Sequence, residues 1–400
     1  MFFKHFLNKD RIYLDYASST PVDVRMVSFF PNIDKFILGA NPSALHKEGV
    51  KLKKVLSAAR ALSAKSIGAQ ENEIIFTSNA TEGDNLAIFG FLKNKIENGA
   101  DPKEIAFFIS PFEHSAILES ISHIDPNIKV SKLVQENGWV MPGKISIPEE
   151  VKIILVSVMF VQNEIGTVQN IKEIVKRIRK LRKEYPDKEI IFHTDATQAP
   201  LYYDLNVIRL GVDMMTLGAT KLYCPKGVGL LYKKRGVKLS PIIYGGGQEM
   251  GLSPGTEPVE LIHTFAHSLK YAQENTEKEF GRIKTLQRYF EKRLKENFPQ
   301  IRITGVGERS PHITHFVVPN IDSELLVLEL DARGIAVSSK SACKNDLPAQ
   351  TGEGFDLLSL LYPGEKVGAI RVSYGRKTTK RELDKTIIAI KHILVKYKIN

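Results

Sequence analysis

The chain has 400 residues, of which 43% are hydrophobic and 25% charged, and its 56 basic and 45 acidic residues give a net charge of +11. This composition is that of an ordinary globular protein of two or three domains, so collagen-like, coiled-coil and wholly disordered chains are excluded. Two cysteines exclude a disulfide framework and a four-thiolate zinc site, which favours a reducing compartment. No apolar run approaches the roughly 20 residues that cross a bilayer, so we expect a cytoplasmic protein. We also expect no metal site.

Short apolar runs alternate with amphipathic helical patterns over the first 240 residues. Several runs are almost continuously apolar, as in strands covered on both faces. After the third run, Ile171, Ile174 and Ile178 share one face of a predicted helix that Pro186 ends. This alternation predicts an α/β fold with a largely parallel sheet. The predicted strands are residues 73–78, 104–110, 151–158, 189–194, 212–217 and 227–232.

The pattern changes after the glycine-rich residues 244–247. A helical stretch, a strand-like run, a loop around Cys343, a second run and an amphipathic helix follow each other. We therefore predict a large domain over residues 12–257 and a smaller α+β domain made of residues 1–11 and 258–400. The elements expected in the smaller domain are residues 258–297, 312–318, 370–375 and 379–398.

Polar residues follow each predicted strand of the large domain. In open α/β sheets, ligands bind at the carboxyl ends of the strands, so these residues are expected to share one crevice. The crevice would contain the N-terminus of a helix with a hydroxyl group, an imidazole, side-chain amides, a carboxylate and a lysine. The residues concerned are 79–83, 113–114, 162–164, 195–198 and 218–221.

Three of these residues could together hold pyridoxal phosphate. Thr81 lies at a strand-to-helix turn, where free amides bind phosphate, although an ordinary helix cap has the same sequence. Asp195 ends an apolar strand, and a buried carboxylate there would suit a pyridinium nitrogen, although it could also be a helix N-cap or part of a structural ion pair. Lys221 could form a Schiff base in a desolvated pocket or be a solvated loop lysine. Phosphate site, carboxylate and lysine are the three groups that a pyridoxal phosphate enzyme needs.

A series of longer motifs carries a resemblance over nearly the whole chain. In chain order they include YLDYASSTPVD at 13–23, NPSALH at 41–46, IIFTSNATEGDNLAI at 74–88, EHSAIL at 113–118 and NEIGTVQ at 163–169. TDATQ at 194–198, KLYCPKGVGLLY at 221–232, YGGGQE at 244–249, SSKSAC at 338–343 and IRVSYGRKT at 370–378 follow. With them the chain resembles the cysteine desulfurases, which are pyridoxal phosphate enzymes of the class V aminotransferase group. The resemblance implies a homodimer of fold type I, in which helices cover a mostly parallel mixed sheet and a smaller α+β domain follows.

The resemblance implies a role for each matching residue of the cofactor site. Lys221 would bind pyridoxal phosphate covalently, and Asp195 would bond to its pyridinium nitrogen. His114 would stack on the ring and move protons, and Gln198 would contact the ring hydroxyl. The residues that would hold the phosphate are Ala80 and Thr81.

The substrate site is implied in the same way. Asn163 would contact both the cofactor and the substrate carboxylate, and Asn41 would line the entrance. Arg371 would bind the same carboxylate, since a guanidinium can do so through two parallel hydrogen bonds. Without the resemblance, Arg371 could be an ordinary strand arginine at the surface.

Cys343 distinguishes between related activities. It lies among small and polar residues, a composition typical of an accessible loop, where a thiol suits nucleophilic attack. The resemblance implies that L-cysteine becomes L-alanine and that its sulfur passes to Cys343 as a persulfide. An acceptor protein would then take the sulfur for iron–sulfur cluster assembly or tRNA thiolation. The second thiol, Cys224, is predicted to be a buried packing residue.

The chain departs from the family pattern around the phosphate. Residues 218–220 lack the usual serine and histidine, although Thr220 would keep one hydroxyl contact. Residues 250–254 lack two arginines, whereas Thr256 matches the threonine that reaches the partner subunit's phosphate. Lys340 replaces a glycine and could lower the pKa of the nearby thiol. We therefore predict weaker cofactor retention than is usual for the family.

Two alternatives to a cysteine desulfurase stay open. One is a selenocysteine lyase or another class V aminotransferase-like enzyme, which need not have the loop cysteine. The other is a catalytically weakened or non-catalytic scaffold of the same fold, prompted by the departures and the positive charge. Because the basic residues are spread over helix faces with few aromatic residues between them, we do not expect direct nucleic-acid binding.

Overall fold

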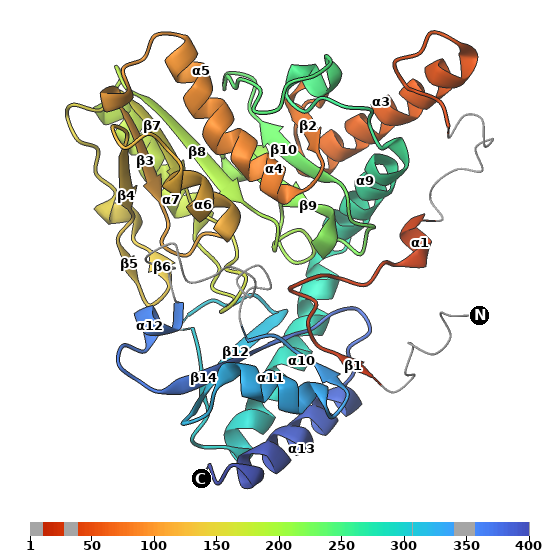
Figure 1. Ribbon diagram of the computed structural model, residues 1–400, viewed down its shortest axis with the longest axis vertical. Coiled ribbons are helices and arrows are strands. Elements are labelled where there is room, and N and C mark those ends of the chain that lie inside the picture. Colours follow the sequence, from red (N-terminus) through yellow and green to blue (C-terminus); the bar gives the residue numbers. More distant parts are fainter. Residues whose placement is uncertain (1–10, 28–38, 306, 340–356, 400) are drawn as a thin grey trace. The chain divides into compact units, whose positions relative to one another are not determined.

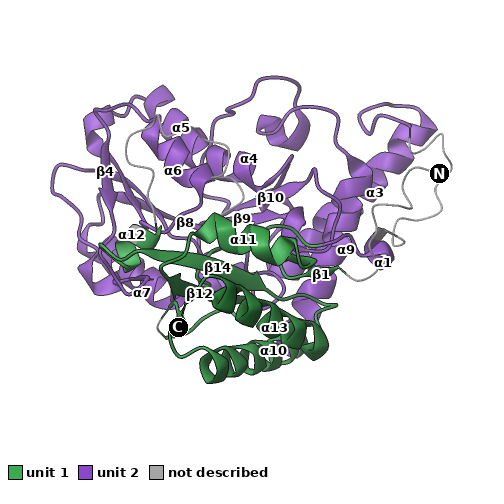
Figure 2. Ribbon diagram, turned by 60° about the horizontal axis from the view of Figure 1, so that its bottom comes forward, with its two compact units in different colours: residues 1–20, 163–167, 278–400 green, residues 21–162, 168–277 purple. Residues whose placement is uncertain are grey.

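The computed structural model describes residues 11–27, 39–305, 307–339 and 357–399. These residues form two compact units, coloured separately in Figure 2. The large unit contains residues 21–162 and 168–277. The small unit contains the described residues among 1–20, 163–167 and 278–400. No helix of the described ranges is long and apolar enough to span a membrane.

A seven-stranded sheet is the centre of the large unit (Figure 1). Each predicted strand is confirmed to within two residues at either end, and an additional short strand, β4, lies at one edge. The order across the sheet is β2 (Ile74–Thr77), β10 (Gly229–Lys233), β9 (Met214–Gly218), β8 (Glu189–Asp195), β7 (Ile153–Ser157), β3 (Ile105–Ile109) and β4 (Lys129–Lys132).

The direction of the strands decides where their ends meet. Strand β10 is antiparallel to both of its neighbours, β2 and β9, whereas β9, β8, β7, β3 and β4 pair in parallel. Strand β2 therefore runs in the same direction as the parallel set. As expected, the carboxyl ends of β2, β3, β7, β8 and β9 meet at one edge of the sheet.

Helices follow the strands of the large unit. Helix α4 packs on β2, β9 and β10, and α7 packs on β8 and ends before Pro186, as predicted. The helices are α1 (Val24–Val27), α3 (Lys47–Ile67), α4 (Ala80–Asn85), which continues through a π-helical turn (Leu86–Gly90) into α5 (Phe91–Glu97), α6 (Ser115–Ser122), α7 (Ile171–Glu184), α8 (Val207–Leu210) and α9 (Val259–Glu274). A hairpin of β5 (Gln135–Glu136) and β6 (Trp139–Val140) lies outside the main sheet.

The core of the large unit contains side chains from these strands and helices. Burial of each large apolar side chain contributes about 1.5–3 kcal/mol, so this cluster fixes the strand ends that carry the polar residues. Fully buried members include Ile75, Leu86, Phe91, Phe107, Leu155, Met214 and Leu231.

The small unit is built on an antiparallel sheet of β11 (Arg302–Ile303), β12 (Ile313–Pro319) and β14 (Val367–Ser373). Strand β1 (Ile12–Tyr13) pairs in parallel with β13 (Ile335–Ala336). The predicted strands and last helix are confirmed, and the long helical stretch consists of two helices that meet at Asn275. The helices are α10 (Thr276–Asn297), α11 (Ser323–Asp331), α12 (Leu357–Leu361) and α13 (Lys380–Lys396).

The predicted domain limits, 12–257 and 258–400 with 1–11, differ from these units at three places, one of which is the segment 163–167 in the small unit. Helix α9 belongs to the large unit because it packs along α3. Residues up to Thr20 belong to the small unit, where the amide of Leu14 donates to the carbonyl of Ala336 at 2.9 Å.

Candidate active site

The sheet edge of the large unit gathers most of the predicted site residues. Thr81 lies in the first turn of α4, and His114 is the N-cap of α6. Asp195 is the last residue of β8, and Lys221 ends the 3-10 turn that follows β9. The other predicted residues of this unit are Ala80, Gln198 and Thr220 near the same strand ends, and Asn41 and Thr256 in exposed loop positions.

Asp195 is a buried carboxylate at this edge. It is 5% exposed, and its Oδ1 accepts a hydrogen bond from the amide of Thr197 at 2.8 Å. Among the described residues, no lysine or arginine forms an ion pair with it, so the structural ion pair considered from the sequence is absent there. A buried carboxylate in this setting is suited to a cationic ligand.

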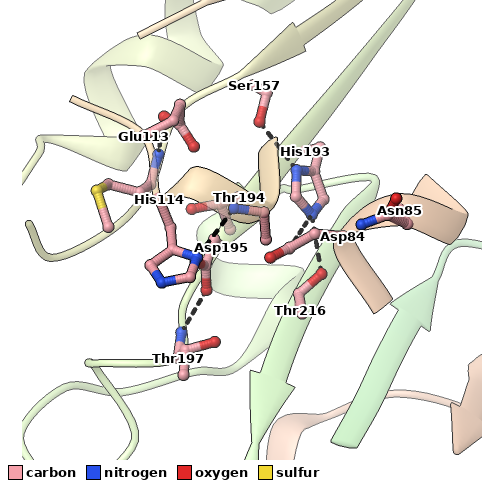
Figure 3. A network of polar contacts seen from close by, with 12 residues as sticks. Asp84, Asn85, Glu113, His114, Ser157, His193, Thr194, Asp195, Thr197 and Thr216 are labelled. Carbon is pink, nitrogen blue, oxygen red and sulfur yellow. Dashed lines mark hydrogen bonds and ion pairs between the residues drawn. The ribbon is translucent and has the colours of Figure 1, made fainter. Parts of the chain in front are cut away.

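Behind Asp195 lies a buried network centred on His193, shown in Figure 3. His193 Nδ1 is 3.0 Å from Ser157 Oγ, and its Nε2 is 3.0 Å from Thr216 Oγ1. Asp84 approaches from α4, with Oδ1 3.7 Å from the same Nε2. Burial lowers the pKa of His193 to about 3, so its imidazole is neutral at physiological pH.

Two further carboxyl groups near Asp195 have raised pKa values, which favours their protonated forms. Burial, and then the charge of Asp195, raise the pKa of Asp84 well above its usual range. Glu113 also has a strongly raised pKa, mainly because of burial, although its Oε1 accepts a hydrogen bond from the amide of Met159 at 2.6 Å. Neither Asp84 nor His193 was predicted from the sequence as a member of the site. The signal in the sequence that could have indicated Asp84 is its place just before the apolar positions of a predicted helix.

The orientation of His114 is fixed by its capping role. Its Nδ1 accepts a hydrogen bond from the amide of Ala116 at 3.1 Å. In the neutral imidazole the proton is therefore on Nε2.

The start of α4 has the geometry of an anion-binding turn. Asn79 Oδ1 accepts from the amide of Glu82 at 2.9 Å, and no hydrogen bond of the described residues uses the amides of Ala80 and Thr81. Gly218 lies so close that a Cβ there would be 3.1 Å from Ala80 Cβ. A side chain at position 218 would therefore require the start of α4 to shift by a few tenths of an ångström.

Arg371 and Asn163 both belong to the small unit. Arg371 is 1% exposed, and its Nη1 donates to the carbonyl oxygen of Asn163 at 2.8 Å. Its Nη2 donates to Asp15 Oδ1 at 2.8 Å and to Ser18 Oγ at 2.6 Å. The alternative of an arginine at the surface is therefore wrong. The contribution of Asp15 was not foreseen, since it is far from Arg371 in the sequence.

The two cysteines differ in what is described of them. Cys343 lies outside the described residues, as does Lys340. Cys224 is 1% exposed, and burial raises the pKa of its thiol to about 12. The prediction that Cys224 is a buried residue is confirmed.

Comparison with known proteins identifies the family. The aminotransferase class-V family matches residues 12–386. The chain belongs to the aminotransferase class-V family. A cysteine desulfurase IscS of Dictyoglomus turgidum is 34% identical, with 97% of this chain and 95% of that protein covered. A cysteine desulfurase IscS of Clostridium botulinum is 35% identical over the same shares of the two chains.

A solved structure agrees with this class V assignment. A NifS-like protein superimposes with a TM-score of 0.82 at 26% identity, and 96% of this chain and 99% of that chain are covered. The predicted fold type I architecture, a mostly parallel mixed sheet with helices and a smaller α+β part, is therefore confirmed. The resemblance to cysteine desulfurases is confirmed as well.

Proposed function

We propose that this class V protein is a pyridoxal phosphate-dependent cysteine desulfurase that converts L-cysteine to L-alanine and transfers the sulfur to Cys343. The observation that carries the proposal is Asp195, a buried carboxylate without a cationic partner among the described residues, at the sheet edge that also holds His114 and Lys221. The similarity to proteins named cysteine desulfurase supports the choice of reaction.

The residues of the large unit fit pyridoxal phosphate by their chemistry. When bound, the cofactor supplies an electron sink for a carbanion. Lys221 would hold it covalently, and Asp195 would pair with its pyridinium nitrogen. Gln198 would contact the ring hydroxyl. The phosphate would be bound by the amides of Ala80 and Thr81, the hydroxyl of Thr220 and Thr256 of the partner subunit.

His114 and Lys221 would move the protons of the reaction. Because Nδ1 of His114 accepts from the amide of Ala116, the transferable proton of the imidazole is the one on Nε2. The amine of Lys221 would accept the α-proton of the substrate as a general base. Asn163 and Arg371 would hold the substrate carboxylate, and Asn41 would line the entrance.

The sulfur transfer balances without an added oxidant. The Cys343 thiolate attacks the sulfur of L-cysteine, so an S–S bond forms while the Cβ–S bond of the substrate breaks. The electron pair of that bond stays with the carbon skeleton, which takes up a proton and leaves as L-alanine. The products are a Cys343 persulfide and L-alanine.

The biological setting follows from this chemistry. A persulfide needs a reducing compartment and a protein that accepts its sulfur, for iron–sulfur cluster assembly or tRNA thiolation. The role of Thr256 requires a homodimer. The positive charge of +11 would favour an acidic acceptor.

The test combines product analysis with two cysteine variants. The purified protein, loaded with pyridoxal phosphate, is incubated with L-cysteine, and L-alanine is measured while persulfide is mapped by mass spectrometry. We expect equal amounts of both, persulfide on Cys343 alone, loss of both in Cys343→Ala and retention in the control Cys224→Ala. Unchanged sulfide release by Cys343→Ala would instead favour a lyase. Absence of alanine with the wild-type protein would favour a scaffold.

A further inference from the structure

His315 and Arg371 are neighbours in the sheet of the small unit. They are directly paired across the antiparallel strands β12 and β14, so their side chains lie on the same face of the sheet. Both residues are only 1% exposed. A buried histidine thus lies beside the buried guanidinium.

Among the residues that the structure describes, each of the two side chains has a buried nitrogen without a hydrogen-bond partner. In Arg371 the two Nη atoms bond to Asn163, Asp15 and Ser18, whereas Nε bonds to none of the described residues. In His315 the atom without a partner in the same set is Nδ1. An unsatisfied buried polar atom destabilises the folded state by about 1–3 kcal/mol, so two of them on paired residues point to a ligand.

The charges at this place specify the kind of donor that His315 supplies. Burial, and then the positive charge of Arg371, lower the pKa of His315 to about 3, so its imidazole is neutral and keeps one N–H group. The negative charge of Asp15 already offsets part of the charge of Arg371. An anion bound there would therefore need a second donor besides the guanidinium.

We propose that His315, through Nδ1–H, binds the α-carboxylate of the amino acid substrate together with Nε–H of Arg371. A carboxylate has two oxygens, each of which can accept one of these two hydrogen bonds. The inference rests on the proposed function for the identity of the substrate. It adds a neutral donor that sequence motifs do not indicate.

The kinetic test uses two variants that differ in one donor. Asn places an amide N–H near the position of Nδ1, whereas Leu fills the space without a donor. We expect His315→Leu to raise the KM for L-cysteine at least about tenfold with kcat within twofold, and His315→Asn to stay near the wild type. Cysteamine lacks the carboxylate, so its inhibition constant should not change in either variant. An unchanged KM in His315→Leu, or an equal loss for cysteamine, would overturn the proposal.

A binding measurement separates this proposal from the proposed function. In protein labelled with 15N-histidine, the Nδ1 resonance of His315 is assigned by its absence from the spectrum of His315→Asn. Addition of L-alanine should shift this resonance, and addition of ethylamine should not. This shift does not depend on turnover. No shift with L-alanine refutes the role of His315, whereas no alanine production by the wild-type protein refutes the desulfurase.

Discussion

Asp84 and His193 face each other in the interior of the large unit, with Asp84 Oδ1 3.7 Å from His193 Nε2. Both are buried, at 1% and 0% exposure. Because the pKa of His193 falls to about 3, its imidazole is neutral near pH 7, and burial raises the pKa of Asp84, which favours its protonated carboxyl group. The arrangement leaves Asp195 as the carboxylate suited to a cationic ligand.

The raised pKa of Asp84 predicts a pH-dependent effect of Asp84→Asn on stability. In the unfolded chain Asp84 ionises above about pH 4, whereas in the folded protein its pKa is raised, so the folded state loses relative stability as the pH rises from about 4 toward the raised pKa. The amide removes this loss. We expect the free energy of unfolding of Asp84→Asn, relative to that of the wild type, to increase by up to about 1.4 kcal/mol per pH unit above pH 4. Below about pH 4 the difference should not depend on pH.

Urea unfolding of the cofactor-free proteins between pH 4 and 8 measures this difference. Asp187→Asn is the control, because Asp187 is exposed. Parallel pH curves for Asp84→Asn and the wild type would show that Asp84 is ionised in the folded protein.

Lys221 is predicted to be the only lysine that binds pyridoxal phosphate covalently. Borohydride reduction of the loaded protein should leave a pyridoxyl group on the peptide that contains Lys221. In Lys221→Ala the labelled peptide should disappear and alanine production should fall at least about 100-fold. Lys226→Ala, which changes an exposed lysine nearby, should behave like the wild type. Labelling of another lysine in the wild-type protein would refute the assignment.

The two thiols are predicted to react at very different rates. Because burial raises the pKa of Cys224 to about 12, almost no thiolate is present at pH 8, and the sulfur is shielded as well. A thiol reagent should therefore modify Cys343 in the native protein and Cys224 only after unfolding. Native Cys343→Ala should react at least about 100-fold more slowly than native Cys224→Ala. Similar rates in the two variants would contradict the buried assignment.

Glu249 is predicted to stabilise an edge of the large sheet. Its carboxylate pairs with Arg60 and accepts a hydrogen bond from the amide of Phe76 in β2 at 2.8 Å. It does so from a left-handed turn, with φ of 49° at Glu249 and 60° at Met250. Loss of both contacts in Glu249→Ala should lower the free energy of unfolding by about 2–4 kcal/mol, because an amide and a guanidinium lose their partner.

Chemical unfolding of Glu249→Ala checks this value, with Glu71→Ala as the exposed control. A loss no larger than that of the control would mean that the turn does not depend on its carboxylate.

The strands of the large unit could be predicted because each is a short apolar run, and burial on both faces leaves that signal in the sequence. Strand β4 could not, since Lys129–Lys132 is mostly exposed and contains a single apolar residue. The reversed direction of β10 was also not predicted. Its own residues resemble those of the parallel strands, and the direction depends on the short connection from β9, which is too short for the usual helical crossover.

The positions of His114, Asp195 and Lys221 at the sheet edge could be predicted because Asp195 ends a strand and the other two follow one closely. Their buried surroundings could not. His193 lies inside a strand, and its partners Asp84 and Thr216 come from other elements. Likewise, the pairing of His315 with Arg371 depends on the register of β12 and β14, which single-strand patterns do not determine.

The pairing of β1 with β13 also sets an order of events during synthesis. The last strand of the large sheet ends at Lys233. Ile12 can pair with Ile335 only after residue 335 has been synthesised, and Arg371 is synthesised after that. Chains fold from the amino-terminal side as they leave the ribosome, unit by unit. The edge that carries Lys221 can therefore form on the nascent chain well before the small unit is complete, so the proposed cofactor site can exist before the proposed substrate residue Arg371 is synthesised.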